Sequence, residues 1–158
     1  MPHLIRTARA LADDLVLLVA GAPQPAALAV EVRSAAAGDP RIRLSLGHVP
    51  DHEVQQYFRG ADLVALPFSD ITNSGSALLA LGFDCPVLVP DRGAMGELQT
   101  LAGPEWVRTY EGELRPAVLA EALEWARTSR TSASPPLTGL DWSRIAEETH
   151  AFYQALEH

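Results

Sequence analysis

The residues best suited to chemistry form a polar loop between two apolar runs. The loop Asp70-Ile71-Thr72-Asn73-Ser74-Gly75-Ser76 leads directly into an apolar helical segment. The first N–H groups of a helix lack intrahelical partners, and the helix dipole adds positive potential there. In one interpretation, Gly75 admits a close ligand while Ser74 and Ser76 add hydroxyl donors, which predicts a phosphate-binding helix start. In the other, Ser74 is simply the N-cap of a buried helix.

The elements around this loop alternate between strands and helices. Apolar runs predict strands at residues 15–20, 42–45, 63–66, 87–89 and 106–110, and helical spacing predicts helices at 2–12, 25–37, 53–59, 77–82 and 115–127. Continuous apolar runs are typical of parallel strands that are covered on both faces. The alternation predicts an α/β fold, in which ligands bind in loops at the carboxyl ends of the strands.

Five short motifs follow one another in a fixed order. In chain order they are the turn LGHVPDHE at 46–53, Leu66-Pro67-Phe68-Ser69 with its loop and helix, Cys85-Pro86-Val87, the turn GAMGE at 93–97, and DWSRIA at 141–146. This order resembles the C-terminal, donor-binding domain of retaining GT-B glycosyltransferases of family 4, although Asp84 replaces a family glycine. The resemblance covers nearly all 158 residues and implies a Rossmann-like, three-layer parallel sheet.

The resemblance also implies two missing parts. A complete domain of the family opens with a strand and a glycine-rich turn that carries basic phosphate ligands, whereas this sequence begins at the following helix. The N-terminal acceptor-binding domain is absent as well. We therefore expect a nucleotide-sugar-binding domain at 1–128 without its first strand, a Pro/Ser-rich linker at 129–140 and a crossover helix at 141–158.

Asp70 is the candidate for a contact with the donor sugar. In the resemblance it lies near the first of two family glutamates, whereas the second glutamate position falls on Leu79, which cannot bind a ribose hydroxyl. We expect the missing carboxylate at position 79 to be replaced by the loop of Thr72, Asn73, Ser74, Gly75 and Ser76. Alternatively, Asp70 is an ordinary Asx-turn residue.

Three further turns supply candidate ligand contacts. The resemblance places the backbone of His48 and Val49 against the nucleotide base, and it matches Glu97 to a family glutamate. Arg92 and Gly93 follow a strand and would meet the pyrophosphate. The alternatives are a solvated turn at each of these positions and, for Glu97, a first-turn carboxylate that complements a helix dipole.

Neither a metal nor a cofactor is expected. The five histidines show no metal-ligand spacing, and the single cysteine, Cys85, excludes an internal disulfide and predicts a buried small hydrophobe. The GT-B resemblance implies that helix dipoles and cationic groups take the place of a divalent ion at the departing diphosphate.

The composition indicates which binding partners and which cellular compartment to expect. The net charge of −8 argues against non-specific binding to nucleic acid or to an anionic membrane surface. All twelve basic residues are arginine, which together with the alanine content indicates a bacterial, GC-rich genome. Without a signal peptide or a membrane-length apolar run, a cytoplasmic protein is expected.

The resemblance implies sugar transfer from a nucleotide-diphosphate donor with retention at the anomeric carbon, and an isolated chain that is inactive. A degenerate, non-catalytic interaction module of the same ancestry is the first alternative. A different doubly wound protein, such as a flavodoxin-like domain, is the second. Against that second alternative, the sequence holds neither a Gly-x-Gly-x-x-Gly fingerprint after its first strand nor a Gly-Lys-Ser/Thr phosphate loop.

The last predicted helix carries an apolar stripe that includes Trp142, Phe152, Tyr153 and Leu156. In the GT-B resemblance this helix packs on the N-terminal domain. Without that partner, the stripe predicts a homodimer or a swapped helix, because exposed apolar surface tends to find a second surface.

Overall fold

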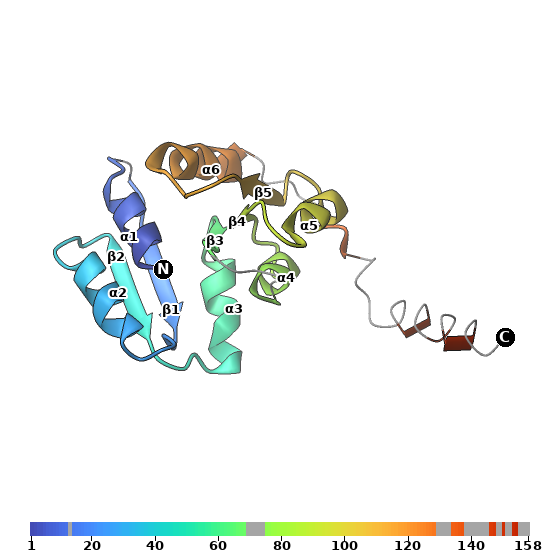
Figure 1. Ribbon diagram of the computed structural model, residues 1–158, viewed down its shortest axis with the longest axis horizontal. Helices are drawn as coiled ribbons and strands as arrows, with labels where there is room; N and C mark the ends of the chain where they lie inside the picture. The colour runs from blue at the N-terminus through green and yellow to red at the C-terminus, as the bar shows by residue number, and fades with distance from the viewer. Residues whose placement is uncertain are drawn as a thin grey trace.

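The chain folds into alternating helices and strands, as predicted. The structure is a computed structural model that describes residues 1–12, 14–68, 75–128, 134–137, 146–147, 150 and 153–154. The strands are β1 (Leu17–Gly21), β2 (Ile42–Leu46), β3 (Val64–Ala65), β4 (Val87–Pro90) and β5 (Val107–Tyr110). The helices are α1 (Pro2–Arg9), α2 (Leu28–Ala36), α3 (Asp51–Arg59), α4 (Gly75–Gly82), α5 (Met95–Ala102) and α6 (Pro116–Thr128) (Figure 1).

All strand pairs are parallel, which confirms the predicted α/β class. β1 pairs with β2, with Leu17 opposite Ile42, and a second sheet has the order β3-β4-β5, with Val64 opposite Val87. The strands therefore form two sheets within the described residues, whereas the sequence predicts a single one.

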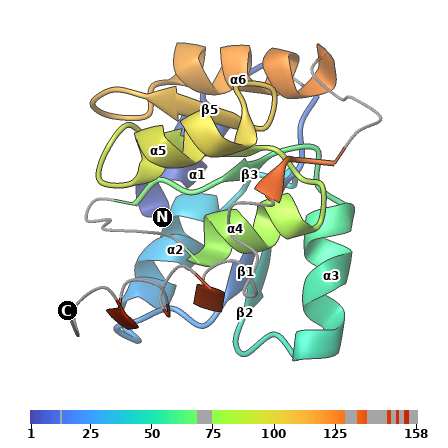
Figure 2. The same ribbon diagram turned by 90° about the vertical axis from the view of Figure 1, so that its right-hand side faces the viewer.

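Two apolar clusters cover the opposite faces of these strands. Leu88 of β4 points into a cluster formed with α1, α2 and α6, while Val87 and Val89 point into a cluster formed with α4 and α5. In Figures 1 and 2 the strands lie between the α1–α2 pair and the α4–α5 pair. This is the three-layer arrangement of a Rossmann-like fold. Cys85 is buried in the second cluster, as predicted.

The prediction of a buried strand at 15–20 is wrong for Val16 and Leu18, whereas the run at 63–66 is half-buried and packs against both apolar clusters. Val16 and Leu18 of the run at 15–20 are 58% and 47% exposed, and β3 contains only two of the four residues predicted. Strands of a parallel sheet are normally buried on both faces because a neighbouring strand and two helix layers enclose them. Within the described residues β1 and β3 each pair with one strand only, and Val16 and Leu18 beside the open edge of β1 stay exposed, whereas Val19 is buried.

Most of the segment from 138 to the C-terminus lies outside the described residues. Trp142, Phe152 and Leu156 of the predicted final stripe lie outside the described residues, and Tyr153 is 62% exposed. Within the predicted linker, Leu137 packs against the cluster around α4 and α5. The homodimer stays a prediction.

Asp84 closes α4 in a backbone conformation that favours glycine. Its φ is +57°, and the end of α4 forms a Schellman motif, in which the Cys85 N–H donates to the Ala80 carbonyl at 3.0 Å and the Asp84 N–H donates to the Leu81 carbonyl at 2.9 Å. This position, C′ of the helix, has a left-handed backbone conformation, which explains why the family has glycine where this chain has Asp84. Aspartate tolerates that region better than most residues.

Asp84→Gly is expected to raise the free energy of unfolding by about 1 kcal/mol, because glycine adopts positive φ without the Cβ clash. Asp84→Val is expected to lower it by at least that amount. Urea unfolding followed by circular dichroism measures both. Equal stability of the Asp84→Gly variant and the wild type would contradict a strained C′ residue.

Arg41 ties the start of β2 to the end of α1. Its guanidinium donates to the Leu11 carbonyl at 2.8 Å, to the Arg9 carbonyl at 3.3 Å and to the Asp39 carboxylate at 2.8 Å. These hydrogen bonds from Arg41, aided by a bond from its backbone N–H, lower the pKa of Asp39. The clamp fixes how α1 lies against the β1–β2 sheet.

Because the pKa of Asp39 is lower in the folded protein, its carboxylate stabilises the fold above the unfolded pKa of about 3.9. That contribution is lost as pH falls through the folded value. We expect Asp39→Asn to be less stable than the wild type at pH 7, and we expect the difference to shrink as pH falls below about 3.9. Urea unfolding at both pH values measures the difference, and a pH-independent difference would contradict the clamp.

Candidate active site

The candidate site lies where two helices begin at the carboxyl ends of neighbouring strands. α4 follows β3 and α5 follows β4, and β3 and β4 are hydrogen-bonded neighbours. The carboxyl ends of parallel strands meet at one edge of the sheet, so the amino ends of α4 and α5 are brought to the same edge. Both amino ends carry positive potential from the helix dipole.

The first turn of α4 is open to a ligand. Gly75 and Ser76 are exposed, and a Cβ added to Gly75 would meet no atom within 4 Å. The helix is anchored by Ala77, Ala80 and Leu81, which are completely buried. The helix therefore buries one apolar face and leaves its amino end accessible, and ligand binding by these two residues stays a prediction.

The turn before α5 holds the second group of predicted residues. Gly93 has a φ of +56°, which glycine adopts without strain, and Arg92 beside it is exposed. The Asp91 N–H donates to the carbonyl of Tyr110 at 2.8 Å, which fixes the turn to β5. Burial raises the pKa of Tyr110, and the charge of Arg92 opposes this rise. Arg92 therefore lies close enough to this strand end to act electrostatically on it.

Glu97 occupies the first turn of α5 and is exposed. A carboxylate at this position complements the helix dipole, as the alternative interpretation holds. It is also free to accept hydrogen bonds from hydroxyl groups of a ligand at the same edge.

His48 and Val49 lie on the other part of the sheet. They belong to the loop between β2 and α3, where His48 is exposed and Val49 is half-buried. β2 pairs with β1, and β3 pairs with β4, so this loop follows a strand of the other sheet (Figure 1). The structure thus places Gly75, Ser76, Arg92, Gly93 and Glu97 at the amino ends of α4 and α5, and places His48 and Val49 after β2. The contact of His48 and Val49 with the nucleotide base stays a prediction.

Four predicted residues, Asp70, Thr72, Asn73 and Ser74, lie outside the described residues. Leu79, which stands at the second family glutamate, is 44% exposed on the outer face of α4 beside Leu78. A side chain at position 79 is therefore accessible, and leucine offers a ligand only apolar contact there.

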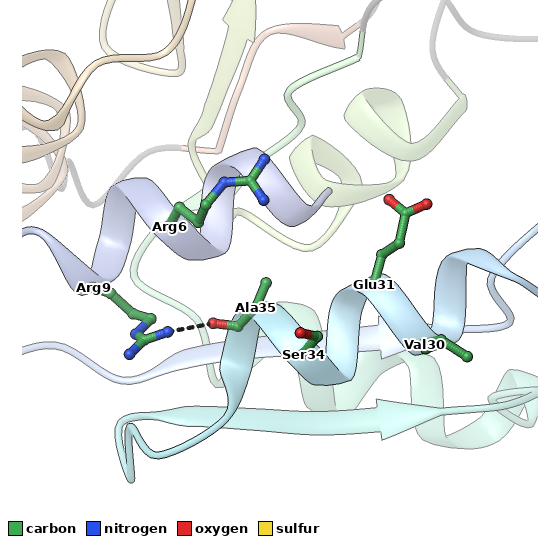
Figure 3. Close-up of a pocket in the computed structure, with 6 residues that line it drawn as sticks. All are labelled: Arg6, Arg9, Val30, Glu31, Ser34 and Ala35. Atoms are coloured by element: carbon green, nitrogen blue, oxygen red, sulfur yellow. Dashed lines mark hydrogen bonds between the residues drawn. The ribbon is translucent and has the colours of Figure 1, made fainter.

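A cavity of about 500 Å³ lies elsewhere, between α1 and α2 (Figure 3). Arg6, Arg9, Val30, Glu31, Ser34 and Ala35 line it. The Arg9 guanidinium donates to the Ala35 carbonyl at 2.9 Å, so it helps to hold the two helices together. Arg6 and Arg9 line it from α1, and Glu31 and Val30 line it from α2, so one carboxylate offsets part of the positive charge of the two guanidinium groups. Helical spacing alone gave no sign of it.

No three histidine, cysteine or carboxylate side chains come together as metal ligands in the described part of the chain. Nor is any helix among those residues long and apolar enough to cross a membrane.

Comparison with known proteins finds two glycosyltransferases that resemble this chain over part of their length. No family model matches it. Two curated proteins from Xanthomonas campestris pv. campestris, both named GDP-mannose:glycolipid 4-beta-D-mannosyltransferase, are each 33% identical to it over 139 residues. The match covers 88% of this chain and 40% of each relative, so the chain spans about two fifths of the length of these relatives. The chain is thus homologous to part of a glycosyltransferase.

Proposed function

We propose that this chain is the donor-binding part of a GT-B glycosyltransferase and that its donor is GDP-mannose. The observation that carries the proposal is the 33% identity to two GDP-mannose-dependent mannosyltransferases over 88% of the chain. The exposed amino ends of α4 and α5 at one edge of the sheet support it, because such ends suit a diphosphate.

In this proposal the diphosphate leaving group binds at the first turn of α4. Backbone N–H groups around Gly75 and Ser76 donate to phosphate oxygens, and Arg92 supplies a cation from the neighbouring turn. Negative charge on the diphosphate grows as the bond to the sugar breaks, so these donors stabilise the transition state more than the ground state. Asp70 would contact the sugar, and Glu97 would accept hydroxyl hydrogen bonds. Catalysis then rests on positioning and electrostatics, without a metal.

The proposal assigns the acceptor to a separate N-terminal domain. The isolated chain is therefore expected to bind the donor without transferring its sugar. Turnover by this polypeptide alone would refute that division of roles.

Whether the transfer retains or inverts the configuration at the anomeric carbon is a separate question. GDP-mannose carries its sugar in the α configuration, so a 4-β-mannoside, such as the name of the relatives describes, forms from it by inversion. The family 4 resemblance instead implies retention. NMR of the product distinguishes the two through the one-bond coupling between C1 and H1, which is larger in α- than in β-mannosides, whereas the H1–H2 coupling is small in both because H2 is equatorial.

A second candidate function is a non-catalytic module of glycosyltransferase ancestry. The exposed Leu79 favours it, since a leucine at this position cannot hold a ribose hydroxyl. The two candidates differ in donor affinity, which an eroded module would have lost.

The test is a titration of the chain with GDP, UDP, ADP and TDP, followed by heteronuclear NMR. We expect binding selective for GDP, with shifts at Gly75, Ser76 and Gly93. Silence for all four nucleotides at millimolar concentration would overturn donor binding and favour the non-catalytic module. Selective binding of another base would retain the diphosphate site and refute GDP-mannose as the donor.

A further inference from the structure

The cavity between α1 and α2 lies on the far side of the strands from the candidate active site. α1 and α2 cover one face of the strands, whereas α4 and α5, whose amino ends form the candidate site, cover the other (Figures 1 and 2). The volume of the cavity is about 500 Å³. Sites for small molecules measure about 300–1,000 Å³, so the cavity has room for one. A ligand bound here would be separate from the proposed sugar donor.

Two arginines line the α1 side of this cavity. Arg6 and Arg9 are three residues apart, so both lie on one face of the helix. Another face of α1 is fixed in the core by Leu4, Ile5 and Ala8, which are buried. α1 contains no acidic residue, so no carboxylate on this helix neutralises the two guanidinium groups.

The two guanidinium groups differ in how they are held. Arg9 donates to the Ala35 carbonyl of α2 at 2.9 Å, which orients its guanidinium between the helices (Figure 3). This bond uses one of the five N–H donors of the group. Arg6 is exposed and forms no hydrogen bond or ion pair with any residue that the structure describes. Two neighbouring guanidinium groups with unused donors suit a phosphate, which accepts charge-assisted hydrogen bonds from both.

The α2 side of the cavity adds groups of a different kind. Glu31 and Ser34 line it, again three residues apart, and both are exposed. The carboxylate accepts hydrogen bonds only, whereas the hydroxyl both donates and accepts. Glu31 would repel a second anionic group but would accept hydrogen bonds from neutral hydroxyls. The lining therefore favours a ligand that carries one phosphate and several hydroxyl groups.

We propose that the cavity between α1 and α2 binds a sugar phosphate, with its phosphate at Arg6 and Arg9 and its hydroxyl groups at Glu31 and Ser34. Val30 of α2 also lines the cavity and is 70% exposed, which leaves an apolar surface for the carbon atoms of the sugar ring. The site differs in chemistry from the diphosphate site at α4, because its carboxylate disfavours a ligand with two phosphates.

The experiment titrates the chain with glucose 6-phosphate, with inorganic phosphate and with glucose, and follows the backbone amides by heteronuclear NMR. A phosphate-free buffer of low ionic strength is needed, because salt screens charges at an exposed site. We expect glucose 6-phosphate to shift the amides of Arg9 and Ser34 and to bind at least about fivefold more tightly than inorganic phosphate, since hydroxyl hydrogen bonds add to the phosphate contact. Glucose alone should shift neither amide.

Arg6→Gln is expected to weaken binding of glucose 6-phosphate by at least about fivefold, because it removes a charged hydrogen-bond donor. The fold should be unharmed, since Arg6 holds none of the described residues in place. Arg33→Gln is the matched control: Arg33 is an exposed arginine of α2 that does not line the cavity, and its removal changes the net charge equally. This control should bind like the wild type. Thermal unfolding of both variants checks that they are folded.

Glu31→Gln tests the hydroxyl contact. Without the carboxylate, inorganic phosphate should bind more tightly, and the preference for glucose 6-phosphate over inorganic phosphate should fall. An unchanged preference would refute the role of Glu31.

Three results would overturn the proposal as a whole. They are unshifted amides in α1 and α2, equal weakening by Arg6→Gln and Arg33→Gln, and affinity for inorganic phosphate equal to that for glucose 6-phosphate. Displacement of glucose 6-phosphate by GDP would also overturn it, since the sugar phosphate would then lie at the candidate active site. The amides of α1 and α2 report on this cavity whether or not the chain binds a nucleotide, so the proposed function can fail without it.

Discussion

Gly75→Asp is expected to weaken GDP binding by about 10- to 100-fold, which corresponds to about 1.4–2.8 kcal/mol. The added carboxylate would stand at the amino end of α4, where it repels the diphosphate at close range. The same carboxylate complements the helix dipole and meets no atom within 4 Å at its Cβ, so the fold should be unharmed or slightly more stable. Isothermal titration calorimetry and thermal unfolding measure the two effects.

Gly82→Ala is the matched control for this variant. Gly82 ends the same helix, and an added Cβ there also meets no atom within 4 Å. It should retain the affinity of the wild type, because it changes α4 far from its amino end. If Gly75→Asp bound GDP as tightly as the wild type, the diphosphate would not lie at α4, even if the nucleotide bound elsewhere on the chain.

Leu88→Ala is expected to lower the free energy of unfolding by about 2–5 kcal/mol. Leu88 is completely buried in β4 and packs in the cluster that α1, α2 and α6 share. Truncation removes its apolar contacts and leaves a cavity that the surrounding strands cannot close. Since domains of this size are stable by only about 5–15 kcal/mol, the variant should unfold at a clearly lower urea concentration.

Leu18→Ala removes the same atoms from a strand whose leucine is 47% exposed. Its expected cost is at most about 1 kcal/mol, because that side chain has little packing to lose. Equal destabilisation by the two variants would mean that the β1–β2 sheet is covered in solution, and that Leu18 is buried there.

The sequence predicted the local structure at the site because the signals are local. The start of α4 near Gly75 and the apolar face of that helix follow from helix spacing and from the preference of a helix amino end for polar and small residues. The departure of Asp84 from the family glycine was visible in the sequence, and its physical reason, a φ of +57° in a Schellman motif, required the backbone.

Hydrophobic periodicity and composition were enough to predict an α/β protein with parallel strands and a helix that begins with small, polar residues at Gly75. They suffice because they describe which side of each segment must be buried. Which strands become neighbours was visible in the folded structure alone, where the sheet is divided between β1 and β3 within the described residues and Leu18 is exposed. Strand pairing depends on hydrogen bonds between segments far apart in the chain, and an apolar run has the same pattern whether its edge is paired or open.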